Sequence, residues 1–94
     1  MNESPPDEVL GDAPSGRRGP AMPLALASVG QDVILAEVRG GGRFTHRMAE
    51  MGLVPGTRFR VLSHNNPGPA LIGLGDGRLV LGHGMVQRVF VYPA

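Results

Sequence analysis

Residues 43–57 join a helical pattern to two stop signals, and this segment limits the possible folds more than any other. Its apolar side chains recur at the i, i+4 and i+7 spacing of one helix face: Phe44, Met48 and Met51. Gly52 follows where a residue in the left-handed region ends a helix, and Leu53 can then contact Met48 in a Schellman cap. We therefore expect one short helix that ends at Gly52.

A tight turn is predicted directly after this cap. Val54-Pro55-Gly56-Thr57 places proline at position i+1 and glycine at position i+2, which is the pattern of a type II turn. From Thr57 onward, apolar and charged residues alternate, with Phe59 and Val61 expected to face inward. The helix is therefore expected to lead through one turn into a strand.

Five short strands are predicted in all, each bounded by turn residues. They cover residues 33–39, 57–63, 70–75, 78–81 and 88–92. In the first strand, Ile34, Ala36 and Val38 are expected to face inward. Asp76-Gly77 predicts a hairpin between the third and fourth strands. Residues 83–87 are expected to form a single helical turn.

So few elements cannot cover both faces of an open sheet. A strongly bent sheet solves this problem by curling around its own apolar face. Glycines within and beside the strands, such as Gly73 and Gly75, suit the tight bends that this shape needs. We therefore expect an all-β fold, an SH3-like barrel of about five strands with one short α-helix that caps an open end.

The first 22 residues differ in composition from the rest of the chain. They are rich in proline, glycine and charged residues, and between the terminal Met1 and Met22 only Val9 and Leu10 are large apolar residues. Such a segment cannot bury enough surface to offset the entropy of ordering. We predict a disordered tail over residues 1–22 and a folded domain over residues 23–94. Translation starting at Met22 is a further hypothesis, which the intact mass of the endogenous protein would test.

Several classes of protein are disfavoured by composition. The chain has no cysteine, so a disulfide framework and a thiolate metal site are excluded. No apolar run approaches the ~20 residues of a membrane span, and the N-terminal segment lacks a signal-peptide pattern. Thr45-His46 and Ser63-His64 are adjacent pairs whose side chains diverge, so they do not form a catalytic arrangement. We expect a soluble, cytoplasmic protein that is not an enzyme and has no cofactor.

The run Arg47-Met-Ala-Glu-Met-Gly-Leu-Val-Pro-Gly56 combines an arginine, a cap and a turn in a fixed order. Together with residues 23–30 before it and the apolar residues at 79–81, 86 and 89–91 after it, this run resembles the FeoA family. These are small cytoplasmic proteins of bacterial ferrous iron uptake. The resemblance covers roughly residues 23–94. The chain departs from the family in having Met48 and Met51 where leucine is usual, a change of similar volume.

This resemblance implies an SH3-like barrel that assists FeoB, the membrane ferrous iron transporter with a cytoplasmic GTP-binding domain. The protein would then be cytoplasmic and recruited to the inner face of the membrane by its partner. The same fold occurs as a domain of iron-dependent repressors, but we expect no winged-helix domain here, so the resemblance favours a standalone accessory protein. A homodimer stays open, and neither nucleic acid nor direct membrane insertion is expected.

A nucleic-acid surface and a metal site are the two alternatives to a partner-binding protein. Five arginines are candidates for one basic, nucleic-acid-binding surface: Arg39, Arg43, Arg47, Arg58 and Arg60. However, aromatic residues for base stacking are scarce. His46 and Glu50 are spaced i, i+4 and could face one metal ion, although we expect a solvated helix face there. Whether His64 or His83 binds metal stays open, and no metal site is predicted.

The candidate partner-binding residues lie on the helix and its exit turn. The turn is too short to bury all of Leu53, Val54 and Pro55, and Arg43 and Arg47 lie nearby in sequence. Apolar residues beside arginine are typical of the central part of protein interfaces. The alternative is that Leu53 only completes the cap and Val54 packs on the strand below.

Overall fold

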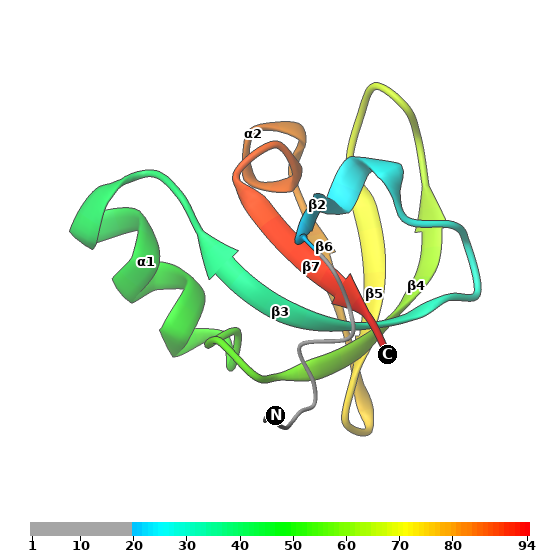
Figure 1. Cartoon of the computed structure of the whole chain (residues 1–94), viewed down its shortest axis with the longest axis horizontal. Helices are drawn as coiled ribbons and strands as arrows, with labels where there is room; N and C mark the ends of the chain where they lie inside the picture. The colour runs from blue at the N-terminus through cyan, green and yellow to red at the C-terminus, as the bar shows by residue number, and fades with distance from the viewer. Residues whose placement is uncertain (1–19) are drawn as a thin grey trace, which may run out of the picture.

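Six antiparallel strands form one bent sheet in the computed structural model, which describes residues 20–94 (Figure 1). The elements are β2 (Met22–Pro23), the 3-10 helix η1 (Leu24–Leu26), β3 (Asp32–Val38), α1 (Gly41–Glu50), β4 (Arg58–His64), β5 (Ala70–Leu74), β6 (Gly77–Leu81), α2 (His83–Val86) and β7 (Val89–Pro93). The strand order is β2-β7-β3-β4-β5-β6, so β3 to β6 form a meander and β7 returns to pair with β3.

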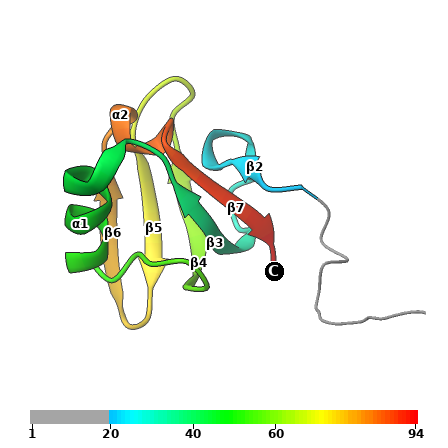
Figure 2. The ribbon, with the colours of Figure 1, turned by 60° about the vertical axis from the view of Figure 1, so that its left-hand side comes forward.

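The predicted SH3-like barrel is confirmed: the sheet curls around a single apolar core. Fully buried side chains come from every strand except β2, and also from both α-helices and η1; they include Leu24, Leu35, Met48, Ile72, Leu81, Val86 and Val89. Helix α1 stands at one end of the bent sheet (Figures 1 and 2), where it joins β3 to β4. No helix among residues 20–94 is long and apolar enough to cross a membrane.

The sixth strand, β2, was not predicted. It consists of two residues, Met22 and Pro23, which pair with Val91 and Phe90 of β7. A strand this short carries no alternating pattern, so its existence depends on the partner strand. The predicted tail lies outside the described residues except for residues 20–22, and the division of the chain at residue 23 stays a prediction.

The predicted Schellman cap ends α1. Gly52 has a φ of 90°, and the Leu53 N–H donates to the Met48 carbonyl over 2.9 Å. The Gly52 N–H donates to the Ala49 carbonyl over 2.9 Å, which completes the motif. The side chain of Leu53 is 2% exposed, so it closes the cap from the inside.

The predicted type II turn follows and is fixed to its surroundings. The Thr57 N–H donates to the Val54 carbonyl over 3.0 Å, and Gly56 has a φ of 95°. The Gly56 N–H donates to the Leu35 carbonyl over 2.8 Å, which ties the turn to β3. The Thr57 hydroxyl donates to the Gly52 carbonyl over 3.2 Å. The helix end, the turn and β3 are thus held as one unit.

The predicted inward face of β3 was wrong. Val33 and Leu35 are the buried residues, at 0% and 1% exposure, whereas Ile34 and Ala36 are half-buried. In the pairing with β7, the register shifts between Leu35 and Glu37, which is the mark of a β-bulge. The bulge shifts the alternation by one residue, so Val38 still packs against the core.

The predicted hairpin between β5 and β6 is confirmed, but its loop lies one residue earlier. Leu74 pairs with Gly77, so the two loop residues are Gly75 and Asp76. Gly75 has a φ of 59°, as the first position of a two-residue hairpin loop requires. The remaining predicted elements agree with the structure, including the buried Phe59 and Val61 of β4 and the helical turn α2.

Candidate partner-binding site

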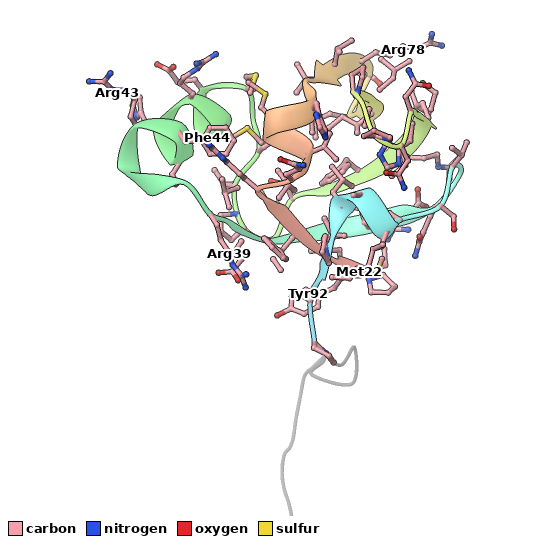
Figure 3. The ribbon with its side chains drawn as sticks, turned by 90° about the horizontal axis from the view of Figure 1, so that it is seen from above. Met22, Arg39, Arg43, Phe44, Arg78 and Tyr92 are labelled. Atoms are coloured by element: carbon pink, nitrogen blue, oxygen red, sulfur yellow. The ribbon has the colours of Figure 1, made fainter. Side chains whose placement is uncertain are left out.

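A groove of about 250 Å³ lies beside α1. Its lining residues are Gly40, Arg43, Phe44, Arg47 and Arg88. Figure 3 shows Arg43 pointing outward from α1, whereas Phe44 lies on the side of the helix that faces the rest of the molecule. The groove therefore combines a half-buried aromatic ring with three guanidinium groups.

Backbone geometry brings the distant Arg88 to this groove. The Arg39 N–H donates to the Arg88 carbonyl over 2.8 Å, which continues the pairing of β3 with β7 beyond Val38. Gly40 then turns the chain into α1 with a φ of 148°. A Cβ atom at Gly40 would lie 3.0 Å from the Phe44 ring and 3.1 Å from the Arg88 Cδ atom, so glycine lets the two side chains approach each other.

Helix α1 begins without a side-chain cap at its N-terminus. Its N-cap is Gly40, no side chain bonds to the cap position, and the next two residues are Gly41 and Gly42. Neither of those two glycines has a neighbouring atom within 4 Å of where its Cβ would be. Helix α1 is therefore bound tightly at its C-terminal end and loosely at the end that borders the groove.

Three arginines around the groove carry unbalanced charge. Within residues 20–94, Arg43, Arg47 and Arg88 form no ion pair with a carboxylate. The Arg88 guanidinium instead lies 5.2 Å from the centre of the Phe44 ring, within the range of a cation–π contact. The groove is thus an apolar floor surrounded by positive charge.

The five predicted partner-binding residues do not form one patch. Arg43 and Arg47 border the groove, whereas Val54 and Pro55 are exposed in the turn beyond the other end of α1. Arg47 lies in the last turn of α1, so among the groove residues on this helix it is the nearest in sequence to the exit turn. Leu53 belongs to neither patch, because its side chain is buried in the cap; Val54 is 45% exposed.

Three of the five groove residues, Gly40, Phe44 and Arg88, are not among the predicted site residues. Gly40 lies between the predicted first strand and the predicted helix, and Arg88 is the first residue of the predicted last strand. Phe44 was assigned to the apolar helix stripe alone. Only the register of β3 with β7 places Arg88 beside α1, and no local pattern in the sequence encodes that register.

Ion pairs divide the five arginines that were considered, and disfavoured, as a nucleic-acid surface. Arg39 donates to Glu37 over 2.6 and 3.0 Å and stacks 3.8 Å from the centre of the Phe90 ring. Arg58 and Arg60 both donate to Asp32, at distances of 2.7–3.2 Å. Of the five arginines considered for nucleic acid, Arg43 and Arg47 are the two without an acidic partner in the described part of the chain.

The histidines are not gathered into a metal site. His46 Nε2 lies 3.3 Å from Glu50 Oε2, and both side chains are exposed, as predicted for a solvated helix face. His83 contacts the Gln87 side chain over 3.2 Å. Residues 20–94 contain no group of three or more histidine or acidic side chains placed to hold one metal ion.

The ion pairs of Asp32 predict a specific acid dependence of stability. Hydrogen bonds from Arg60 and then Arg58 lower the pKa of Asp32 from 3.8 to about 2. A carboxyl group whose pKa is lowered by folding stabilises the fold, and this contribution is complete at pH values above the ordinary pKa of 3.8. The contribution is lost as the pH falls through about 2. We expect Asp32→Asn to have a lower free energy of unfolding than the wild type at pH 7. The difference between the two proteins should become smaller as the pH falls below the ordinary pKa of Asp32.

Urea denaturation from pH 2 to pH 7 would measure this difference. Asp76→Asn in the β5–β6 loop is the matched control, because Asp76 has no ion pair with an arginine among residues 20–94. A difference for Asp32→Asn that is as large at pH 2 as at pH 7 would show that the ion pairs are not its cause.

Comparison with known proteins decides the family. A model of the FeoA domain matches residues 22–93, which is most of the chain. The chain belongs to the FeoA family. A relative from Methanocaldococcus jannaschii has the name Fe(2+) transport protein A. It is 29% identical over 72 residues, which cover 77% of this chain and 87% of the relative.

Solved structures of FeoA proteins share this fold. The crystal structure of an iron uptake regulatory protein (FeoA) has a TM-score of 0.72 and 31% identity, covering 79% of this chain and 99% of that one. A FeoA protein from Chlorobium tepidum has a TM-score of 0.67 at 20% identity, covering 77% of this chain and 70% of that one. A manganese-dependent transcriptional repressor has a TM-score of 0.72 at 21% identity; the match covers 80% of this chain but only 42% of the repressor, and shows the fold alone.

Proposed function

We propose that this FeoA-family protein is an accessory protein of ferrous iron uptake that docks on the cytoplasmic GTP-binding part of a FeoB-like transporter. Family membership and the iron-related names of its relatives support the iron-uptake role. The observation that carries the docking proposal is the groove beside α1, in which an aromatic ring is surrounded by arginines that have no acidic partner among residues 20–94. Docking would recruit the protein to the inner face of the membrane.

The chemistry of the groove suggests what the partner presents. Guanidinium groups bind carboxylates with two parallel hydrogen bonds, and arginine and aromatic residues supply much of the affinity of protein interfaces. We therefore expect an acidic loop or helix with an apolar residue at its centre. Val54 and Pro55 would extend the contact along the exit turn, where both are exposed.

Preorganisation of the exit turn also supports docking there. The turn is tied to β3 by the Gly56–Leu35 hydrogen bond and to the helix end by the Thr57 hydroxyl. A surface that is already ordered loses little entropy when it binds. Val54 and Pro55 are thus presented in one conformation.

Arg47→Ala is expected to weaken binding to the purified cytoplasmic domain of the transporter by about tenfold or more, as for an interface arginine. The melting temperature should stay close to that of the wild type, because Arg47 is exposed. Calorimetric titration measures the affinity, and circular dichroism measures the melting temperature. Pro55→Ala should weaken binding less, because it removes only apolar contact.

Arg78→Ala is the matched control for the loss of one positive charge. Arg78 is exposed on β6 and lies on the opposite side of the molecule from Arg43 in Figure 3. The docking site would be refuted if Arg47→Ala and Arg78→Ala bound equally well. The iron-uptake role has a separate test: normal iron(II) accumulation in a deletion strain would contradict it.

A further inference from the structure

We propose that the groove beside α1 binds an acidic segment of this same chain, residues 3–12. This segment contains four carboxylates and no basic residue: Glu3, Asp7, Glu8 and Asp12. It lies outside the described residues, so the inference rests on the groove, on the sequence of the segment and on the length of chain between them. It does not depend on the proposed transporter partner.

The groove and the segment have complementary charges. The groove presents Arg43, Arg47 and Arg88, none of which pairs with a carboxylate within residues 20–94. By contrast, Arg39, Arg58 and Arg60 each have an acidic partner there. Unsatisfied positive charge is thus concentrated where a carboxylate-rich segment would be attracted most strongly. Each arginine can also take a carboxylate in the bidentate manner.

The apolar part of the groove has a matching apolar pair in the segment. Val9 and Leu10 follow Asp7-Glu8 directly and precede Asp12, so two apolar residues are flanked by acidic ones. In the groove, half-buried Phe44 is flanked by arginines in the same way. We expect Val9 or Leu10 to contact the Phe44 ring while the flanking carboxylates meet the guanidinium groups.

The connecting chain is long enough for the segment to reach the groove. Met22 pairs with Val91, which lies three residues, or roughly 10 Å, along β7 from Arg88. Pro20 precedes Met22 by two residues, which add at most about 7 Å. Asp12 is eight residues before Pro20, which an extended chain can span over about 26–29 Å. The segment must turn back toward Arg88, and Gly16 and Gly19 provide flexible positions for this.

Because residues 3–12 and the groove belong to the same chain, the bound state is populated even if the contact is weak. A short flexible linker gives an effective concentration on the order of millimolar. Exposed ion pairs contribute little individually, so the contact is expected to open readily and to weaken as salt rises. If the proposed docking site is also correct, the segment and the transporter compete for Arg43 and Arg47.

Paramagnetic relaxation in the full chain tests the proposal directly. The sequence has no cysteine, so Ser4→Cys gives a single site for a nitroxide label. We expect the amide signals of residues 40–47 and Arg88 to lose intensity, those of β4 to be retained, and the loss to reverse at 1 M salt. Replacing all four carboxylates, by Glu3→Gln, Asp7→Asn, Glu8→Gln and Asp12→Asn, should restore the signals.

Arg17→Gln with Arg18→Gln is the matched control, because it changes charge in the same part of the chain without removing a carboxylate. That variant should keep the loss of intensity. Equal loss with and without the four carboxylates, or no loss at the groove, would overturn the proposal. In a mixture of nitroxide-labelled and unlabelled chains, a loss of amide signal intensity at the groove of the unlabelled chains would show binding between chains. That result would overturn binding within the same chain.

Discussion

Met48→Ala is expected to lower the free energy of unfolding by about 2–5 kcal/mol. Met48 is 0% exposed and is the one side chain of α1 that is buried completely. Removing it leaves a cavity between α1 and the sheet, which the tied turn at Val54–Thr57 keeps from collapsing. A domain of this size has a stability on the order of 5–15 kcal/mol, so this loss is a large fraction of the total.

Urea denaturation monitored by circular dichroism measures this loss. Met51→Ala is the matched control, because Met51 has the same side chain one turn later but is only half-buried. Its effect should be clearly smaller than that of Met48→Ala. Equal losses at the two positions would mean that the burial of α1 does not depend on Met48.

Gly52→Ala is expected to have the second-largest effect, a loss of about 1–2 kcal/mol from backbone strain. Gly52 has a φ of 90°, which side chains other than glycine adopt at a cost. The added Cβ would also lie 3.3 Å from the Leu74 Cδ2 atom, so Leu74 must move slightly. For a domain of this length, we expect a melting temperature lower by roughly 4–16 °C.

Gly42→Ala provides the opposite control within the same helix. An added Cβ at Gly42 has no neighbour within 4 Å, and alanine favours the helical conformation. This variant should match or exceed the stability of the wild type by up to about 1 kcal/mol. If Gly42→Ala and Gly52→Ala lowered the melting temperature alike, the left-handed geometry of the cap could not be the reason.

These variants separate architecture from binding. Met48 and Gly52 act on the position of α1, whereas Arg47 is exposed and is expected to affect binding alone. A protein that loses binding only when it also loses stability would have no docking surface at this helix. One that loses binding through Arg47→Ala at unchanged stability would support the groove.

Local signals in the sequence were sufficient for most of the fold. The cap at Gly52, the turn at Pro55-Gly56 and the β5–β6 hairpin each depend on residues that are neighbours in sequence. Strand β4 was assigned correctly because its apolar and charged residues alternate, with Phe59 and Val61 buried and Arg58 and Arg60 exposed. Where chemistry within a few residues determines conformation, the sequence is a reliable guide.

Features that depend on distant partners could not be predicted in this way. Residues 33–36 of β3 are all apolar, so the sequence contains no alternation that would identify the inward face. The bulge at Ala36 and the pairing of β2 exist only in relation to β7. For the same reason Arg88 was not recognised as a neighbour of Gly40. Two of the five groove residues, Arg43 and Arg47, were therefore identified from the sequence, whereas the place of Arg88 depends on strand register.

The glycine-rich start of α1 has a consequence for whatever binds beside it. With Gly40, Gly41 and Gly42 at its first turn and no side-chain cap, the helix will fray from that end, while its C-terminal end stays fixed by Gly52 and Leu53. Fraying removes Arg43 and Phe44 from their places in the groove. A bound segment must therefore order the first turn of α1 as it binds, and part of its intrinsic affinity is spent on that loss of entropy.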